Sequence, residues 1–177
     1  MYRLATIIFS IVLLSLQCTT SQADDQTHEP SVTDAEIIQF ILDRNNFHKE
    51  RDLNLILKYF PKVGVIMIDR TLGDKAEEIV QKSEEVATQT KKVWDRFTPK
   101  EMDSFMSGTA LRNVTRKEKS VILRCSYMDL VPIEDRHLLA KGVMDFTLVK
   151  VDKKVTMTRK ELIASNSTWI TIKNNNP

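Results

Sequence analysis

Residues 137–151 read HLLAKGVMDFTLVKV, and this stretch decides the fold. Neighbouring side chains of a β-strand point to opposite faces, so every second residue shares a face. One set is wholly apolar and consists of Leu138, Ala140, Gly142, Met144, Phe146 and Leu148. The other set is mixed and consists of His137, Lys141, Asp145 and Thr147 together with Leu139, Val143 and Val149. The rhythm predicts a long strand with its apolar face buried under other elements and a mixed outer face.

Four other stretches of the C-terminal half are also strand-like and are separated by charged turns: 109–115, 120–128, 154–164 and 168–173. In the second of them, apolar residues alternate with Arg124 and Ser126. Cys125 belongs to the apolar set with Tyr127, which predicts a small buried side chain rather than a reactive thiol. The C-terminal half therefore predicts an antiparallel sheet.

The N-terminal half has the spacing of helices. Thr33 and Glu36 form a capping box at the start of a helix that runs to about Asn46. A second helix is predicted over 51–60, because Pro61 cannot continue it. A short run over 63–68 reads as a strand that ends at Asp69.

A long helix is predicted after Gly73, and a short one from Thr98 to Met106. The apolar stripe of the long helix consists of Ala76, Ile79, Val80, Val86, Val93, Trp94 and Phe97. Because the helices come first and the antiparallel strands last, the order predicts an α+β fold in which N-terminal helices pack on a curved antiparallel sheet.

The first 23 residues have the plan of a cleavable signal peptide. Arg3 precedes an apolar run from Leu4 to Leu16, and small polar residues lead to Ala23. A run of 13 residues is shorter than the roughly 20 that a membrane-spanning helix needs. The sequence predicts a secreted, extracellular protein without stable membrane insertion, made of a flexible leader (24–30), a single domain (31–173) and a loose tail (174–177).

Charge and cysteine content narrow the classes of function. After cleavage 25 basic and 24 acidic side chains remain, because the signal peptide contains only Arg3. Such a balance gives no basic footprint for nucleic acid. Cleavage also removes Cys18, which leaves Cys125 without an intrachain disulfide partner. The sequence contains two Asn-x-Ser/Thr triplets, Asn113-Val114-Thr115 and Asn166-Ser167-Thr168. Asn113 and Asn166 are therefore candidate glycosylation sites.

No cofactor or metal site is predicted. His28, His48 and His137 do not stand at metal-ligand spacing from cysteine or carboxylate residues. The chain also has four glycines and no Gly-x-Ser-x-Gly or phosphate-loop motif.

The order of elements resembles one known superfamily. The chain is similar to the nuclear-transport-factor-two-like (cystatin-like cone, SnoaL-like) superfamily. The similarity rests on Arg51-Asp52-Leu53 leading to Tyr59-Phe60, followed by a short strand, Gly73, a long helix and long terminal strands. Among its members the chain looks most like small secreted domains of animals such as nematodes. The resemblance implies a cone whose open end leads to an apolar pocket, which serves isomerases, dehydratases, ligand binders and interaction modules.

The candidate pocket residues come from the helices and from the strands. They are Tyr59, Phe60, Asp69, Trp94, Phe97, Tyr127, Met144 and Phe146, and core packing explains the aromatic ones equally well. Asp69 is the candidate general base, with Arg70 either as its orienting partner or as its partner in a surface ion pair.

The resemblance to ketosteroid isomerase suggests three groups to look for: an aspartate base, a tyrosine and a protonated aspartic acid. Asp69 stands where the base is expected and Asp145 near the second aspartate, but Phe40 occupies the region of the tyrosine. Asp145 also alternates with the apolar face, so its carboxyl group points to solvent.

Two hypotheses follow for the function. The first is a non-enzymatic secreted domain that binds a small apolar ligand or a protein partner, including a homodimer through the outer sheet face. The alternative is an isomerase- or dehydratase-like enzyme that uses Asp69 as general base on an apolar substrate.

Overall fold

A computed structural model describes residues 31–98, 101–102, 105–133 and 136–170 of the chain. The predicted signal peptide, leader and tail lie outside the described residues. In chain order the elements are α2 (Asp34–Glu50), α3 (Asn54–Leu57), β1 (Val65–Asp69), the 3₁₀ helix η1 (Arg70–Lys75), β2 (Glu78–Gln81), α4 (Ser83–Trp94), β3 (Met106–Arg116), β4 (Val121–Ile133), β5 (Arg136–Val151) and β6 (Lys154–Ile170).

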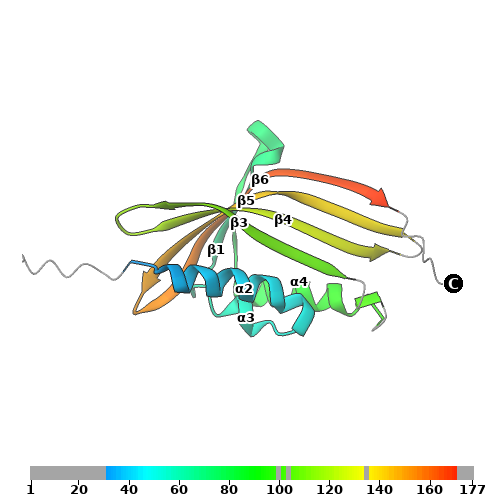
Figure 1. Cartoon of the computed structure of the whole chain (residues 1–177), viewed down its shortest axis with the longest axis horizontal. Coiled ribbons are helices and arrows are strands. Elements are labelled where there is room, and N and C mark those ends of the chain that lie inside the picture. Colours follow the sequence, from blue (N-terminus) through cyan, green and yellow to red (C-terminus); the bar gives the residue numbers. More distant parts are fainter. Residues whose placement is uncertain (1–30, 99–100, 103–104, 134–135, 171–177) are drawn as a thin grey trace, which may run out of the picture.

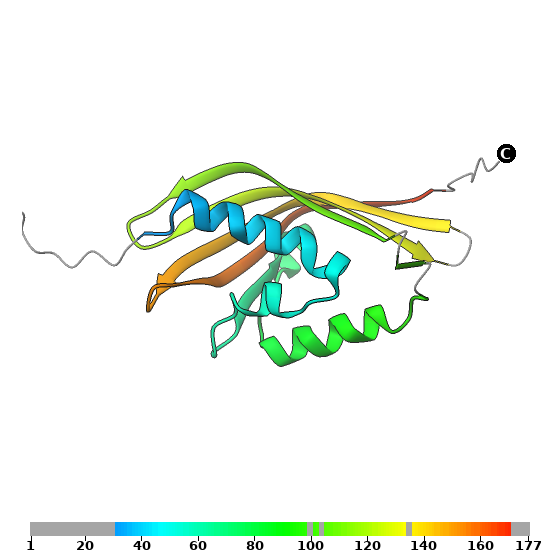
Figure 2. The same ribbon diagram turned by 60° about the horizontal axis from the view of Figure 1, so that its bottom comes forward.

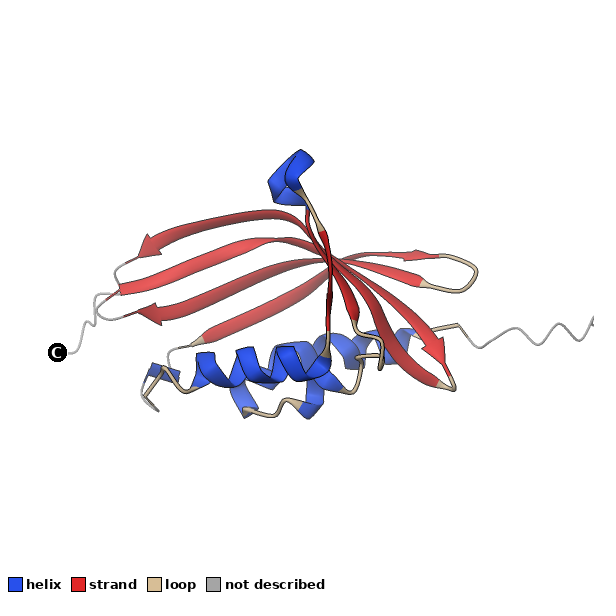
Figure 3. Ribbon diagram, turned by 180° about the vertical axis from the view of Figure 1, so that it is seen from behind, coloured by secondary structure: helices blue, strands red, loops and turns tan. Residues whose placement is uncertain are grey.

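The strands form one curved sheet in the order β2-β1-β6-β5-β4-β3. All neighbouring strands are antiparallel except β1 and β6, which run parallel. Helices α2, α3 and α4 lie on one side of the strands (Figures 1 and 2), while η1 stands apart from them at the end of β1 (Figure 3). The predicted α+β architecture is confirmed.

Helix α2 begins where the capping box predicts. The Thr33 hydroxyl accepts a hydrogen bond from the Glu36 backbone N–H (3.3 Å), and the Glu36 carboxylate accepts one from the Thr33 N–H (2.8 Å). The helix continues to Glu50, four residues beyond the predicted end, and stops at Arg51 with a left-handed φ of 52°.

The predicted apolar face of β5 is buried in the core. Met144, Phe146 and Leu148 are buried, and the Phe40 ring of α2 meets Phe146 edge-on at a centroid distance of 5.2 Å. Cys125 of β4 is fully buried, and burial raises the pKa of its thiol to about 11. The prediction of a buried, unreactive cysteine is consistent with both observations.

The long helix predicted after Gly73 is wrong in its first half. Ile79 and Val80 lie in β2, which pairs antiparallel with β1, and both side chains are exposed. Their β-branched side chains favour a strand, and the helix starts only at Ser83, where the Glu85 carboxylate accepts a hydrogen bond from the Lys82 N–H (3.1 Å).

Three other boundaries differ from the predictions. Helix α3 covers Asn54–Leu57 rather than 51–60, because the Asp52 carboxylate accepts a hydrogen bond from the Asn54 N–H (2.9 Å) in a turn that precedes it. Met106 begins β3 instead of ending a helix. The two last predicted strands form the single strand β6, which ends the described residues at Ile170.

Two bulges change which side chains of β6 face the helices. Leu148 pairs with Met157 but Thr147 pairs with Arg159, so Thr158 is an extra residue on β6. A bulge of this kind moves the following side chains to the opposite face. Lys160 therefore lies opposite Phe146 and faces the concave side, whereas Arg159 and Glu161 face outward.

Among the described residues, no helix combines the length and apolar character needed to cross a membrane.

Candidate functional site: a cavity inside the cone

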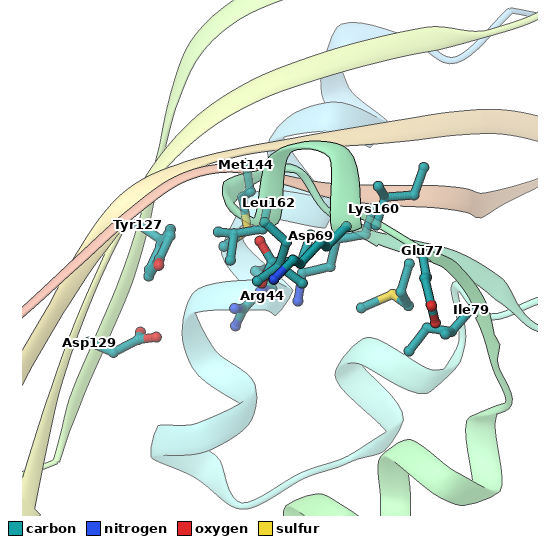
Figure 4. Close-up of a pocket in the computed structure, with 13 residues that line it drawn as sticks. Arg44, Asp69, Glu77, Ile79, Tyr127, Asp129, Met144, Lys160 and Leu162 are labelled. Atoms are coloured by element: carbon teal, nitrogen blue, oxygen red, sulfur yellow. The ribbon is translucent and has the colours of Figure 1, made fainter.

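A cavity of about 630 Å³ is lined by Arg44 of α2, by the segment from β1 to β2, and by strands β4, β5 and β6. Its apolar lining consists of Met67, Ile68, Leu72, Ile79, Met144 and Leu162. Its polar and charged lining consists of Arg44, Asp69, Lys75, Glu77, Tyr127, Asp129 and Lys160. Figure 4 shows Arg44 in the middle of this group, with Tyr127 and Asp129 on one side and Glu77 and Ile79 on the other. This volume and mixture are typical of small-molecule sites.

Three of the eight sequence-derived pocket candidates line this cavity: Asp69, Tyr127 and Met144. Phe60 and Phe146 line a second cavity of about 200 Å³. Tyr59, Trp94 and Phe97 line neither of these two cavities. Tyr59 and Trp94 are instead buried in the core, and Phe97 follows the end of α4.

Asp69 occupies the end of β1 at the cavity. Its Oδ1 atom accepts hydrogen bonds from the Thr71 backbone N–H (3.0 Å) and the Thr71 hydroxyl (2.5 Å), which caps the start of η1. Its Oδ2 atom accepts no hydrogen bond within the described part of the chain. The Arg70 guanidinium pairs with Glu161 at 3.1 Å rather than with Asp69, so Arg70 is not an orienting partner of that carboxylate.

The polar groups on the sheet side are held by side chains of other strands. The Tyr127 hydroxyl shares a hydrogen bond with the Ser165 hydroxyl (2.8 Å), and the Ser107 hydroxyl donates to Asp129 Oδ1 (2.6 Å). Tyr127 and Asp129 therefore keep fixed positions on the wall.

Two cations of the cavity, Arg44 and Lys160, were not among the sequence-derived candidates. Arg44 looks like an ordinary polar residue of an amphipathic helix, and Lys160 stands between Arg159 and Glu161 in a charged run. Only the bulge at Thr158 brings Lys160 to the inner face, and a bulge leaves no clear sequence signal.

Asp43 is a buried polar group whose hydrogen bonds are made away from the cavity. Asp43 of α2 accepts hydrogen bonds from Tyr59 Oη (2.5 Å), Lys58 Nζ (2.8 Å) and Gln39 Nε2 (2.9 Å). Burial alone would raise the pKa of Asp43, but these three donors lower it overall. The cluster joins α2 to the segment around α3 and has a structural role.

Two of the three groups suggested by the resemblance to ketosteroid isomerase are missing from the cavity. Phe40 is fully buried and has no hydroxyl, so it offers no proton donor. The Asp145 carboxylate lies on the outer face, where it accepts hydrogen bonds from Arg124 Nε (2.9 Å) and Nη2 (2.8 Å). Of the three groups, only Asp69 reaches the cavity.

The predicted glycosylation sites lie elsewhere. Asn113 of β3 and Asn166 of β6 are both exposed, and their glycosylation stays a prediction. In the described ranges, no three His, Cys, Asp or Glu side chains are grouped so that they could hold a metal ion.

Neither a family model nor a curated protein sequence matches this chain. Solved structures do match it. An NTF-2-like protein of unknown function from Shewanella oneidensis MR-1 has 12% identity and a TM-score of 0.53, covering 71% of this chain and 93% of its own.

Two further structures belong to proteins with described activities. The β subunit of benzoate 1,2-dioxygenase from Burkholderia mallei ATCC 23344 has 8% identity and a TM-score of 0.56, covering 75% of this chain and 91% of its own. The hexachlorocyclohexane dehydrochlorinase LinA-type3 from Novosphingobium barchaimii LL02 has 10% identity and a TM-score of 0.53, covering 79% and 90%. At these identities the likeness concerns the fold alone. The chain therefore has the fold of the NTF-2-like proteins, which includes enzymes and proteins of unknown function.

Proposed function

We propose that the protein binds a small, largely apolar ligand in the cavity of about 630 Å³. The observation that supports this most directly is the lining itself, in which six apolar side chains line the cavity beside seven polar or charged ones. Burial of an apolar ligand against such walls removes its surface from water, which is the main driving force for binding.

Filling the cavity tests this proposal. Leu162 lines the cavity and is half-buried, so Leu162→Trp should occupy ligand space. We expect compounds from a panel of alkanols, steroids and aromatic hydrocarbons to raise the Tm of the wild type, and Leu162→Trp to bind them at least about tenfold more weakly. Leu111→Trp, at an exposed position of β3, is the matched control and should bind as the wild type does. Equal binding by Leu162→Trp, or no response to any compound, would contradict the proposal.

The alternative is an isomerase- or dehydratase-like enzyme with Asp69 as general base. The supporting observation is that Asp69 lines the cavity with Oδ2 free of hydrogen bonds from described residues. That oxygen is available to accept a proton from a bound C–H group.

Hydrogen exchange separates the two functions. A base that removes a ligand proton and returns one from solvent introduces deuterium into the ligand in D₂O, which mass spectrometry detects. For an enzyme we expect Asp69→Asn to slow exchange at least about a hundredfold while ligand affinity is kept. Asp145→Asn, which changes a carboxylate on the outer face, should leave the rate unchanged. A wild type that binds ligands without exchange is a binding protein.

We also propose that the protein is secreted. The support is the charge and apolar pattern of residues 1–23, with Ala23 at the cleavage position. Expression of the full chain in eukaryotic cells should release a protein that begins at Asp24 into the medium, as N-terminal sequencing would show. Retention of an uncleaved chain in the cells would contradict secretion.

A further inference from the structure

Arg44 and Lys160 place two positive charges in the apolar interior of the cone. Both line the cavity of about 630 Å³, and both also line the smaller cavity of about 200 Å³ beside it. Neither side chain forms an ion pair with a carboxylate of the described residues. Arg44 Nη1 is buried and has no hydrogen-bond partner there.

Unpaired cations in partly buried positions are costly, and the charge of Arg44 acts on Lys160. Burial, followed by the charge of Arg44, lowers the pKa of Lys160 to about 8, and the charge of Asp129 opposes both effects. Burial likewise lowers the pKa of Arg44, and the charge of Asp129 opposes this effect. Because an anion held by both cations would relieve the repulsion and satisfy the free N–H group, the arrangement favours a negatively charged ligand.

The surroundings define the rest of the ligand. Met67 lies beside Lys160 in the β1–β6 register, and Met144 and Leu162 pair across β5 and β6. These apolar walls exclude a small inorganic anion as the best occupant, because it would leave them facing empty space or water.

The carboxylates of the cavity do not neutralise the two cations directly. Asp69 is bonded to Thr71, and Asp129 accepts from Ser107. Glu77 is exposed, as is Lys75, at the open end of the cavity. Asp129 acts on Arg44 and Lys160 through space, so it competes with a ligand anion without forming an ion pair.

We propose that Arg44 and Lys160 together bind the carboxylate of an amphipathic organic acid whose apolar part fills the cavity. This rests on the proposed ligand-binding function and specifies the chemical class of the ligand. Arg44 offers a planar fork that suits a carboxylate, and Lys160 adds a point charge.

Dodecanoate and dodecanol are suitable probes because they share an apolar chain and differ in the charged group. In calorimetric titrations at pH 7 we expect dodecanoate to bind at least tenfold more tightly than dodecanol. Lys160→Met keeps a long apolar side chain and should remove most of this difference, with dodecanol affinity changed less than about twofold. Lys160→Arg should keep the preference for the acid.

Asp129→Asn provides a variant with the opposite expected effect. Removal of the competing carboxylate should tighten dodecanoate binding severalfold and leave dodecanol unchanged. Raising the pH from 7 to 9 should weaken dodecanoate binding by about tenfold, since a group with a pKa of about 8 goes from roughly nine-tenths to one-tenth protonated. Dodecanol binding should not follow this change.

The outcomes separate this inference from the proposal on which it rests. Equal affinities for the two probes, unchanged in Lys160→Met and Asp129→Asn, would overturn the anion site and leave the apolar cavity as a ligand site. Absence of binding by both probes would contradict both. Urea unfolding of Lys160→Met checks the fold, and removal of an unpaired buried charge should keep or raise its stability.

Discussion

His48 of α2 shows how burial selects one protonation state. The Trp94 indole Nε1–H donates a hydrogen bond to His48 Nδ1 (3.0 Å), so this nitrogen is an acceptor and carries no proton. Burial, followed by the positive charge of Arg44, lowers the pKa of His48 to about 3. The unfolded chain binds a proton at its ordinary pKa of 6.5, so folding stability contributed by neutral His48 is lost as the pH falls from 6.5 toward 3.

His48→Gln should remove this pH dependence, because the Gln carbonyl oxygen can accept from Trp94 and does not titrate. Between pH 6.5 and 5 the wild type should lose about 1.7 kcal/mol more unfolding free energy than the variant, because the slope rises from half to nearly all of about 1.4 kcal/mol per pH unit over this range. The pKa values of Glu36 and Asp43 are lowered, so these carboxylates titrate below this window. Urea unfolding at both pH values measures the difference, and parallel losses in the two proteins would contradict it.

Tyr59 has a structural role in place of the predicted pocket role. Burial and the bond to Asp43 raise the pKa of its hydroxyl well above its usual range, so it remains a donor. Tyr59→Phe should cost about 1.5–3 kcal/mol of unfolding free energy, because it withdraws a donor from a buried carboxylate. Tyr127→Phe, which loses a neutral partner, Ser165, should cost about 0.5–1.5 kcal/mol. Equal costs in urea unfolding would show that the charge of Asp43 does not matter.

The alternation of apolar and polar residues predicted the buried face of strand β5 but not that of its neighbour β6. The buried set of Met144, Phe146 and Leu148 followed from a period of two, since β5 keeps one register with β4 along its length. In β6 the same reasoning would place Arg159 and Glu161 inward, and the bulge at Thr158 places Lys160 there instead. Asp69, which ends a short apolar run, was therefore found from sequence, while the two cations of the site depend on tertiary pairing.

The predicted start of the long helix was wrong for a related reason. Ile79 and Val80 fit the apolar stripe of a helix as well as they fit a strand. Only their pairing with β1 decides between the two structures. Both side chains remain exposed, so burial gave no periodic signal that would distinguish the two structures.

Gly142 determines how closely β5 and β6 approach. A Cβ atom there would lie 1.9 Å from the Ala164 carbonyl oxygen and 2.7 Å from Tyr127 Cε1, so the backbone would have to shift. Gly142→Ala should lower the unfolding free energy by about 2 kcal/mol or more. Gly108→Ala is the matched control in β3, where the nearest atom lies at 3.9 Å, and it should change stability by less than about 1 kcal/mol. Thermal and urea unfolding of both variants measure the contrast, which would be absent if β6 moved freely.

The two sides of the sheet differ in what covers them. The helices cover the concave side, where Arg44 of α2 lines the cavity, whereas none of α2, α3 and α4 covers the outer side (Figure 2). On that outer side Met128 is half exposed and pairs with Lys141 across the β4–β5 register, while Val143 of β5 pairs with Ser126, two residues before Met128. Apolar residues on an otherwise uncovered sheet face favour association with a second copy, as the sequence predicts.

A homodimer through this face would place Met128 near the partner and leave the cavity open on the other side. We expect sedimentation of the cleaved protein to give twice the mass of one chain at micromolar concentration. Met128→Lys should give the monomer, since it puts a charge into the contact and repels its own copy across a two-fold axis. Ile38→Lys, a similar change at an exposed position of α2, should leave the dimer intact. Because the cavity lies on the opposite side, ligand affinity should be the same in monomer and dimer, and a monomeric wild type would refute this use of the outer face.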